Sequence, residues 1–195
     1  KEEKAMNTEE KTQVTMVKGT GGKYRWVALT ALFLAIGTIL RLVSPSAAGV
    51  ISPNWTIAMY CLVMILIRPT FGQALGIGLV AGAIAVASSK AAVPFGNLVS
   101  EPIGALVCAL LVRADLRIKW GKVNLQPAVF SLLTTFASGF TFVTITKLVL
   151  GEQLPMNVYL YVMVPTVLTV AALNTVVTQI LYFPVYKIFV KKGEE

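Results

Sequence analysis

The sequence has no histidine, only two cysteines and little charge, and each shortage excludes a class of protein. Charged residues make up 13% of the chain, whereas a typical soluble domain has about 25%. Without histidine, neither a common transition-metal site nor a serine–histidine or cysteine–histidine catalytic pair is expected. Cys61 and Cys108 lie inside apolar runs, which predicts buried thiols and no disulfide or metal pair. We therefore expect a protein that is not an enzyme and holds no metal or cofactor.

The sequence also lacks machinery that would power a transport step. The stretch GTGGK at 19–23 is a weak match to a phosphate-binding loop, because Val17 replaces the first glycine and Tyr24 replaces the Ser or Thr. No row of Asp or Glu runs through the apolar stretches, as a proton-coupled carrier would need. The net charge is +8, but the basic residues lie in the terminal segments and short loops, where they set membrane topology. A nucleic-acid partner is therefore not expected.

What the chain has is apolar sequence, at 56% of its residues, in long uncharged runs. Six runs qualify as membrane spans, at residues 26–43, 55–67, 71–87, 97–112, 127–150 and 158–190. The second run is short for a full crossing, and the sixth is too long for a straight one. Pro165 and Pro184 are expected to kink the sixth span or to mark its ends. The predicted fold is an all-α integral membrane protein with six transmembrane helices.

Basic residues predict the orientation of these spans. Of the 17 Lys and Arg residues, fourteen fall on one side: six in the first 25 residues, one at Arg68, four at 113–122 and three from Lys187 onward. Basic loops stay in the cytoplasm, and an even number of spans returns the chain to its starting side, so both termini are predicted to be cytoplasmic. The predicted parts are a cytoplasmic arm at 1–25, a six-helix membrane domain at 26–190 and a cytoplasmic tail at 191–195.

The three remaining basic residues, Arg41, Lys90 and Lys147, fall on the outer side. Glu101 lies one turn into the fourth span from the same side. An ionisable group within a span is costly unless it is paired or hydrated, so Glu101 and Lys147 are candidate functional residues. Alternatives are a structural pair of Glu101 with Lys147 or Arg41, and side chains that extend to the membrane interface.

Polar and aromatic residues lie at a similar depth. An amide without partners is unfavourable in hydrocarbon, so Asn174 is expected to face the interior of the bundle. Trp55 has an alternative role in the aromatic belt at the membrane surface. The predicted substrate-binding residues at the outer face are Arg41, Asn54, Trp55, Lys90, Asn97, Glu101, Lys147 and Asn174.

Small residues recur four apart in the first and third spans. Ala28, Ala31 and Ala35 share one helix face, which allows another backbone to approach closely. This face is either packed against a neighbouring span or a docking surface for a partner membrane protein. In the third span, the pairs Gly72–Gly76 and Gly78–Gly82 favour packing within the chain.

These features resemble those of a known group of proteins. The predicted six spans, inward N-terminus, outward polar pocket and the alanines Ala31 and Ala35 resemble the substrate-binding S components of energy-coupling factor (ECF) transporters. Within that group, residues 28–186 are most similar to the bacterial tryptophan transporter family. The matching stretches are GVISP at 49–53, NLVSEP at 97–102, Pro165 with LNT at 173–175, and FPV at 183–185.

The resemblance implies a multi-pass protein of the bacterial cell membrane that captures a small molecule at the outer face. In ECF transporters, the alanines of the first span contact a transmembrane coupling subunit, and two ATPase subunits drive uptake. The chain departs from the family pattern at Asn54, where an acidic residue is expected, and at Ser100–Glu101, where an acidic–basic pair is expected. The ligand therefore stays open between a vitamin and a tryptophan-like molecule. A solitary secondary transporter for tryptophan and a non-transport membrane scaffold are the alternatives.

Overall fold

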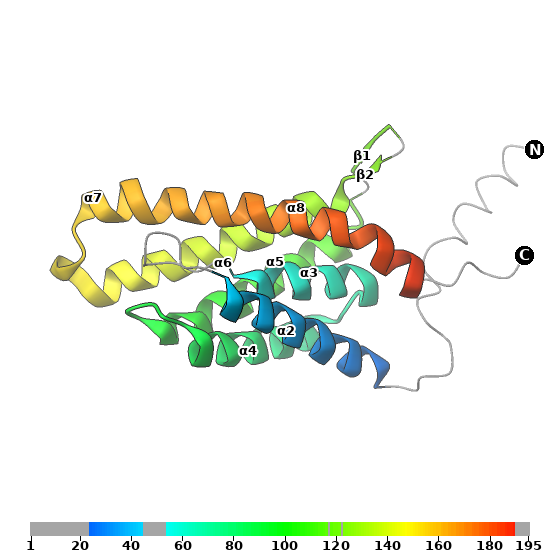
Figure 1. The fold of residues 1–195 in the computed structure, drawn as a ribbon, viewed down its shortest axis with the longest axis horizontal. Coiled ribbons are helices and arrows are strands. Elements are labelled where there is room, and N and C mark those ends of the chain that lie inside the picture. The colour runs from blue at the N-terminus through cyan, green and yellow to red at the C-terminus, as the bar shows by residue number, and fades with distance from the viewer. Residues whose placement is uncertain (1–23, 45–53, 117, 122, 190–195) are drawn as a thin grey trace, which may run out of the picture.

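The computed structural model describes residues 24–44, 54–116, 118–121 and 123–189, which form one elongated helical bundle (Figure 1). The predicted tail at 191–195 and most of the predicted arm at 1–25 lie outside the described residues. The main helices are α2 (Arg25–Val43), α3 (Trp55–Ile67), α4 (Phe71–Ser88), α5 (Asn97–Arg113), α6 (Gln126–Leu150) and α8 (Val164–Phe189). They follow the six predicted runs to within a few residues at each end, except that the sixth run is divided.

Five of the helical segments are long and apolar enough to cross a membrane, and they contain α2, α4, α5, α6 and α8. The exception is α3, whose 13 residues span about 20 Å at 1.5 Å per residue, less than the hydrocarbon core of a bilayer. Every residue from Thr56 to Leu66 is buried, and α3 packs against all five of the longer helices. The short apolar run is therefore the central helix of the bundle.

The two closest helices are α4 and α5, and glycines on α4 allow the approach. A Cβ atom built on Gly78 would lie 2.6 Å from the Cα of Pro102, and one on Gly82 would lie 2.7 Å from the carbonyl oxygen of Asn97. Gly72 and Gly76 have nothing within 4 Å at the same position. The prediction of internal packing is thus confirmed for Gly78 and Gly82 and wrong for the other pair, which faces outward on the same helix.

The turn between α3 and α4 is tied to the end of α5. Arg68 ends α3 in the left-handed region with a φ of 47°, and its guanidinium forms an ion pair with Asp115 and a hydrogen bond with the Val112 carbonyl. Arg113 donates a bond from Nε to the Pro69 carbonyl oxygen. The predicted basic loop at 113–122 leads into a small antiparallel pair of strands, β1 (Lys119–Trp120) and β2 (Val123–Asn124), which the all-α prediction did not include.

The last helical segment runs from Met156 to Phe189 in three parts: α7 (Met156–Val158), a π-helical turn labelled η3 (Tyr159–Met163) and α8. Pro165 is the second residue of α8, directly after the π turn, where the altered hydrogen-bond pattern accommodates its missing N–H. Pro184 lies inside α8, which continues to Phe189. The prediction for Pro165 is thus confirmed as the start of the α-helical part, whereas Pro184 does not end the helix.

The difference between the inward-facing and the outward-facing glycines of α4 leads to a prediction about stability. Gly78→Ala is expected to lower the free energy of unfolding by about 1–3 kcal/mol, because the new methyl group meets the α5 backbone. Gly76→Ala, the matched control, is expected to leave it unchanged or raise it by up to about 1 kcal/mol, because alanine favours the helix. Thermal unfolding of the purified protein in detergent measures both, and equal shifts would contradict the close approach of α4 and α5.

Candidate functional site

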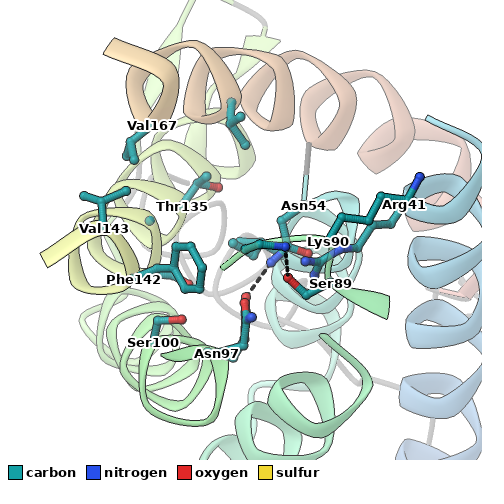
Figure 2. Close-up of a pocket in the computed structure, with 16 residues that line it drawn as sticks. Arg41, Asn54, Ser89, Lys90, Asn97, Ser100, Thr135, Phe142, Val143 and Val167 are labelled. Carbon is teal, nitrogen blue, oxygen red and sulfur yellow. Dashed lines mark hydrogen bonds between the residues drawn. The ribbon is translucent and has the colours of Figure 1, made fainter. Parts of the chain in front are cut away.

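A cavity is lined by residues from the end of α2, the start of α3, the end of α4 and the start of α5, together with residues of α6 and α8 (Figure 2). It contains about 660 Å³ of space free of protein atoms, a figure that includes the open solvent at its mouth. Its lining residues are Arg41, Asn54, Ile57, Ser89, Lys90, Ala91, Asn97, Ser100, Glu101, Thr135, Ser138, Gly139, Phe142, Val143, Val167 and Val170. Segments that are far apart in the sequence therefore build one site.

Arg41 and Lys90 lie on one side of the cavity (Figure 2), and Glu101 is the acidic residue of the lining. Glu101 is 1% exposed and Arg41 is 8% exposed, whereas Lys90 is on the surface. The Nε and Nη1 atoms of Arg41 and the Oε2 atom of Glu101 are buried and have no hydrogen-bond partner among the described residues. In the same part of the chain, Arg41 and Glu101 form no ion pair. A buried acidic and a buried basic side chain thus line the cavity with hydrogen-bonding capacity to spare.

The position of Glu101 is fixed by a chain of hydrogen bonds from three other helices. Asn54, the residue before α3, donates a hydrogen bond from its amide to Oε1 of Glu101 (Figure 2). Asn174 on α8 donates from Nδ2 to the backbone carbonyl of Asn54 at 3.2 Å and to Oγ1 of Thr135 on α6 at 3.1 Å. The carboxylate on α5 is therefore connected to α3, α6 and α8.

The opposite side of the cavity is built by α6 and α8 and carries apolar residues beside the polar Thr135 and Ser138 of α6. Phe142 and Val143 from α6 face Val167 from α8 (Figure 2). Val143 and Val167 also form a small hydrophobic cluster with Met163, separate from the main core around α3. The cavity therefore has a charged half and an apolar half, a combination that suits a ligand with a charged end and an apolar body.

Of the eight predicted substrate-binding residues, five line this cavity, namely Arg41, Asn54, Lys90, Asn97 and Glu101. Their role in binding stays a prediction. Among the other three, Trp55 donates from Nε1 to Oγ of Ser44 at 2.6 Å, and Asn174 lies behind the lining, fully buried as predicted.

The third residue outside the lining is Lys147, which is bound to the end of its own helix. Its Nζ donates to the carbonyl oxygens of Gly151 at 2.8 Å and Leu154 at 2.7 Å. A basic side chain is favoured at a helix C-terminus, where carbonyl groups lack partners. The structural pairs considered for Glu101, with Lys147 or with Arg41, are therefore both absent from the structure.

Sequence reasoning missed two kinds of lining residue. Thr135 and Ser138 belong to a polar row on α6 with Ser131 and Thr134, and all four are buried. Spacings of three and four in an apolar helix mark one face, so this row was a usable signal. The apolar lining, including Phe142 and Val167, carried none, because lipid-facing residues have the same composition.

The predicted docking residues lie on the outside of the bundle. Ala28, Ala31 and Ala35 are all exposed on α2, so the expectation that they pack against a neighbouring span of this chain is wrong for the described residues. The contact of α2 with α3 is made instead at Gly37, where a built Cβ would lie 2.8 Å from the Cα of Thr56. Docking of a partner on the alanine face stays a prediction.

Cys61 and Cys108 are both buried and free, with their Sγ atoms 3.4 Å apart, which confirms the prediction of buried thiols. Across the described residues, no group of three His, Cys, Asp or Glu side chains comes together as a metal site would need.

Comparisons with known proteins give the relatives of the whole chain. The family model described as "Tryptophan transporter TrpP" matches residues 23–190. A protein of Bacillus subtilis named "Probable tryptophan transport protein" is 27% identical over 88% of this chain and 95% of its own length. A protein of Clostridium perfringens with the same name is 30% identical over 80% of this chain and 88% of its own length. No solved structure matches the chain.

The hydrogen bonds of Asn174 lead to a second prediction about stability. Asn174→Ala is expected to lower the free energy of unfolding by about 1–3 kcal/mol, because it leaves buried polar groups on α3 and α6 without a partner. The matched control is Thr175→Ala, whose hydroxyl bonds only to the Ala171 carbonyl of its own helix, and it is expected to change stability little. Thermal unfolding that shifts equally in both variants would mean that Asn174 does not connect these helices.

Proposed function

The chain belongs to the tryptophan transporter TrpP family, and we propose that it binds an aromatic amino acid of the tryptophan type, as a zwitterion, in the cavity. It is a multi-pass protein of the bacterial cell membrane. The proposal is carried by one observation: a buried cation and a buried anion, both with hydrogen-bonding atoms to spare, line the same cavity opposite an apolar wall.

Each part of a zwitterionic amino acid has a matching group. The guanidinium of Arg41 has Nε and Nη1 atoms with no hydrogen-bond partner among the described residues, and a guanidinium donates charge-assisted hydrogen bonds to a carboxylate. Oε2 of Glu101 accepts from the ligand ammonium, while Oε1 keeps its bond with Asn54. The ring lies against Phe142 and the valines of α6 and α8. Lys90, at the surface, attracts the carboxylate on entry.

A zwitterion also satisfies the charge balance of the site. Glu101 and Arg41 are too buried to be hydrated fully, and an unpaired charge in a membrane interior is unfavourable. A neutral ligand leaves both groups unpaired, and a simple anion leaves Glu101 unpaired. A ligand that carries one charge of each sign pairs both groups at once. Asn54, which stands where an acidic residue is expected in the family, adds no second negative charge.

The proposed topology has all six helices inserted in the membrane, both termini in the cytoplasm and the cavity open to the outside. It is supported by the basic residues of the described chain. Arg68, Arg113 and Lys119 lie at the end of the bundle away from the cavity. Arg41, Lys90 and Lys147 belong to helix ends or loops at the cavity end. Because basic residues are retained in the cytoplasm, the end with the additional N-terminal and C-terminal basic residues is the inner one.

Uptake is proposed to be driven by partners, with this chain as the S component of an ECF-type importer. The sequence has no nucleotide-binding motif and no row of acidic residues through the spans. The exposed alanines Ala28, Ala31 and Ala35 offer a flat strip on α2 for a transmembrane coupling subunit. Two ATPase subunits bound to that coupling subunit would supply the energy. The partners would then move the chain with its bound ligand, so the chain itself would need no site for ATP hydrolysis or ion coupling.

The charged pair can be tested with ligands that lack one charge. Glu101→Gln is expected to weaken tryptophan binding at least about tenfold, or about 1.4 kcal/mol, but not the binding of indole-3-propionate, which has no ammonium. Arg41→Gln is expected to weaken tryptophan to a similar extent and to spare tryptamine, which has no carboxylate. Calorimetry on the purified chain measures each affinity.

Lys147→Gln is the control for the charged pair, because it removes a basic group outside the cavity and is expected to leave tryptophan affinity unchanged. Wild-type affinity in both the Glu101 and Arg41 variants would remove these residues from the site. If no tryptophan-like compound and no vitamin binds the wild-type chain, the scaffold interpretation is favoured instead.

The docking surface has its own test. Replacement of Ala31 and Ala35 by Phe is expected to abolish co-purification of the coupling subunit and the ATPases, and with it uptake, while tryptophan binding persists. Ala83→Phe, at an exposed alanine of α4, is the matched control and should retain assembly. Uptake into vesicles without ATPases, in response to an ion gradient, would contradict the S-component role and favour a solitary carrier.

A further inference from the structure

In the apolar half of the cavity, α6 and α8 approach each other closely at Gly139 and Val167. Both residues line the cavity, and a Cβ atom built on Gly139 would lie 2.8 Å from Cγ1 of Val167. A separation below 3.0 Å leaves no room for even one methyl group, so glycine is the residue that allows Val167 its present place. The side chain of Val167 therefore ends the cavity directly over the backbone of α6.

The π turn before α8 sets which residues stand behind this wall. The inward positions of α8 include Val167, Val170 and Asn174, and a regular helix would place Leu160, seven residues before Val167, on the same face. Leu160 is instead 48% exposed, and its neighbour Tyr159 packs against the cluster of Val143, Met163 and Val167. The extra residue of the π turn thus shifts the inward position by one and brings an aromatic ring behind the valines.

Two further contacts hold the wall in place. The hydroxyl groups of Tyr159 and Thr144 are 3.3 Å apart, which links the π turn to α6. Lys147 fastens the loop between α6 and α7 through the carbonyl oxygens of Gly151 and Leu154. Val143 is 1% exposed and Val167 is 5% exposed, and both pack in one cluster with Met163, against which Phe142, Leu154 and Tyr159 also lie. A ligand atom that overlaps Val167 therefore meets a supported surface.

We propose that Gly139 and Val167 form a size filter that limits the ring of the ligand, with the π turn as the support of Val167. This inference rests on the proposed function, because it takes the ring of an aromatic amino acid to lie in the apolar half. The charged half then fixes the amino-acid end, and the filter decides which rings fit at the other end. Packing against a fixed wall discriminates a single added methyl group by about 10- to 200-fold in favourable cases.

The filter is tested by enlarging the cavity and adding a matching group to the ligand. Wild-type protein is expected to bind tryptophan at least about tenfold more tightly than at least one of the tryptophans methylated at ring positions four to seven. Val167→Ala is expected to reduce that preference at least about fivefold for the same compound, because the methyl group then occupies the vacated space. The measurement is the ratio of two dissociation constants by calorimetry, and a general loss of stability does not change such a ratio in favour of the larger ligand.

Two variants complete the design. Val176→Ala is the matched control, since this valine is on the outer face of α8 and 55% exposed, and it should keep the wild-type ratio. Gly139→Ala moves Val167 toward the ligand, so it is expected to weaken tryptophan more than phenylalanine, whose ring is smaller. Unchanged ratios in both Val167→Ala and Gly139→Ala would overturn the filter while leaving tryptophan binding itself intact. If the wild-type chain binds no aromatic amino acid, the proposed function and the filter fail together.

Discussion

The arrangement of this structure depends on the burial of one carboxylate, that of Glu101, inside an apolar bundle. A charge in such a place is unfavourable unless other groups compensate it, and the chain brings these groups from α2, from the start of α3 and from α8. Asn54 donates to the carboxylate from the start of α3, and Asn174 holds Asn54 from α8. Arg41 supplies the opposite charge from α2. The same requirement that stabilises Glu101 thus creates a polar site deep among helices that are otherwise apolar.

The position of Glu101 depends in turn on how closely α5 approaches its neighbour. Gly78 and Gly82 let the backbone of α4 lie against Pro102 and Asn97, on either side of the carboxylate. In a membrane, small residues of this kind favour association because van der Waals contact replaces the hydrophobic effect as the driving force. The glycines therefore act far from the ligand itself, by placing one helix so that its only acidic residue faces the cavity and not lipid.

Much of this could be predicted from the sequence, because the physical rules for membranes are strict. Long apolar runs located the helices, and the unfavourable burial of an amide predicted that Asn174 faces inward. Lys147 was predicted to bind the substrate, but it does not line the cavity. Its position in the sequence does not reveal that its ammonium donates to the carbonyl oxygens of Gly151 and Leu154 after α6. The apolar wall was unpredictable for another reason. A valine that faces a ligand and a valine that faces lipid look alike in sequence. The one-residue shift of the π turn at Tyr159 also corresponds to no recognisable sequence pattern.

The charged and the apolar halves of the cavity lie at two different kinds of helix interface. The charged half is set by α2, α3 and α5, which pack through small and apolar residues. The apolar half lies between α6 and α8, which are joined by buried polar contacts such as the 2.9 Å bond from Thr178 to Ser131. Hydrogen bonds between membrane helices contribute about 0.6 kcal/mol each on average. A ligand with its charged end at Glu101 and its ring at Val167 touches both interfaces at once. Occupancy of the cavity would then join the two parts of the bundle, and the loaded chain would differ from the empty one in rigidity as well as in charge.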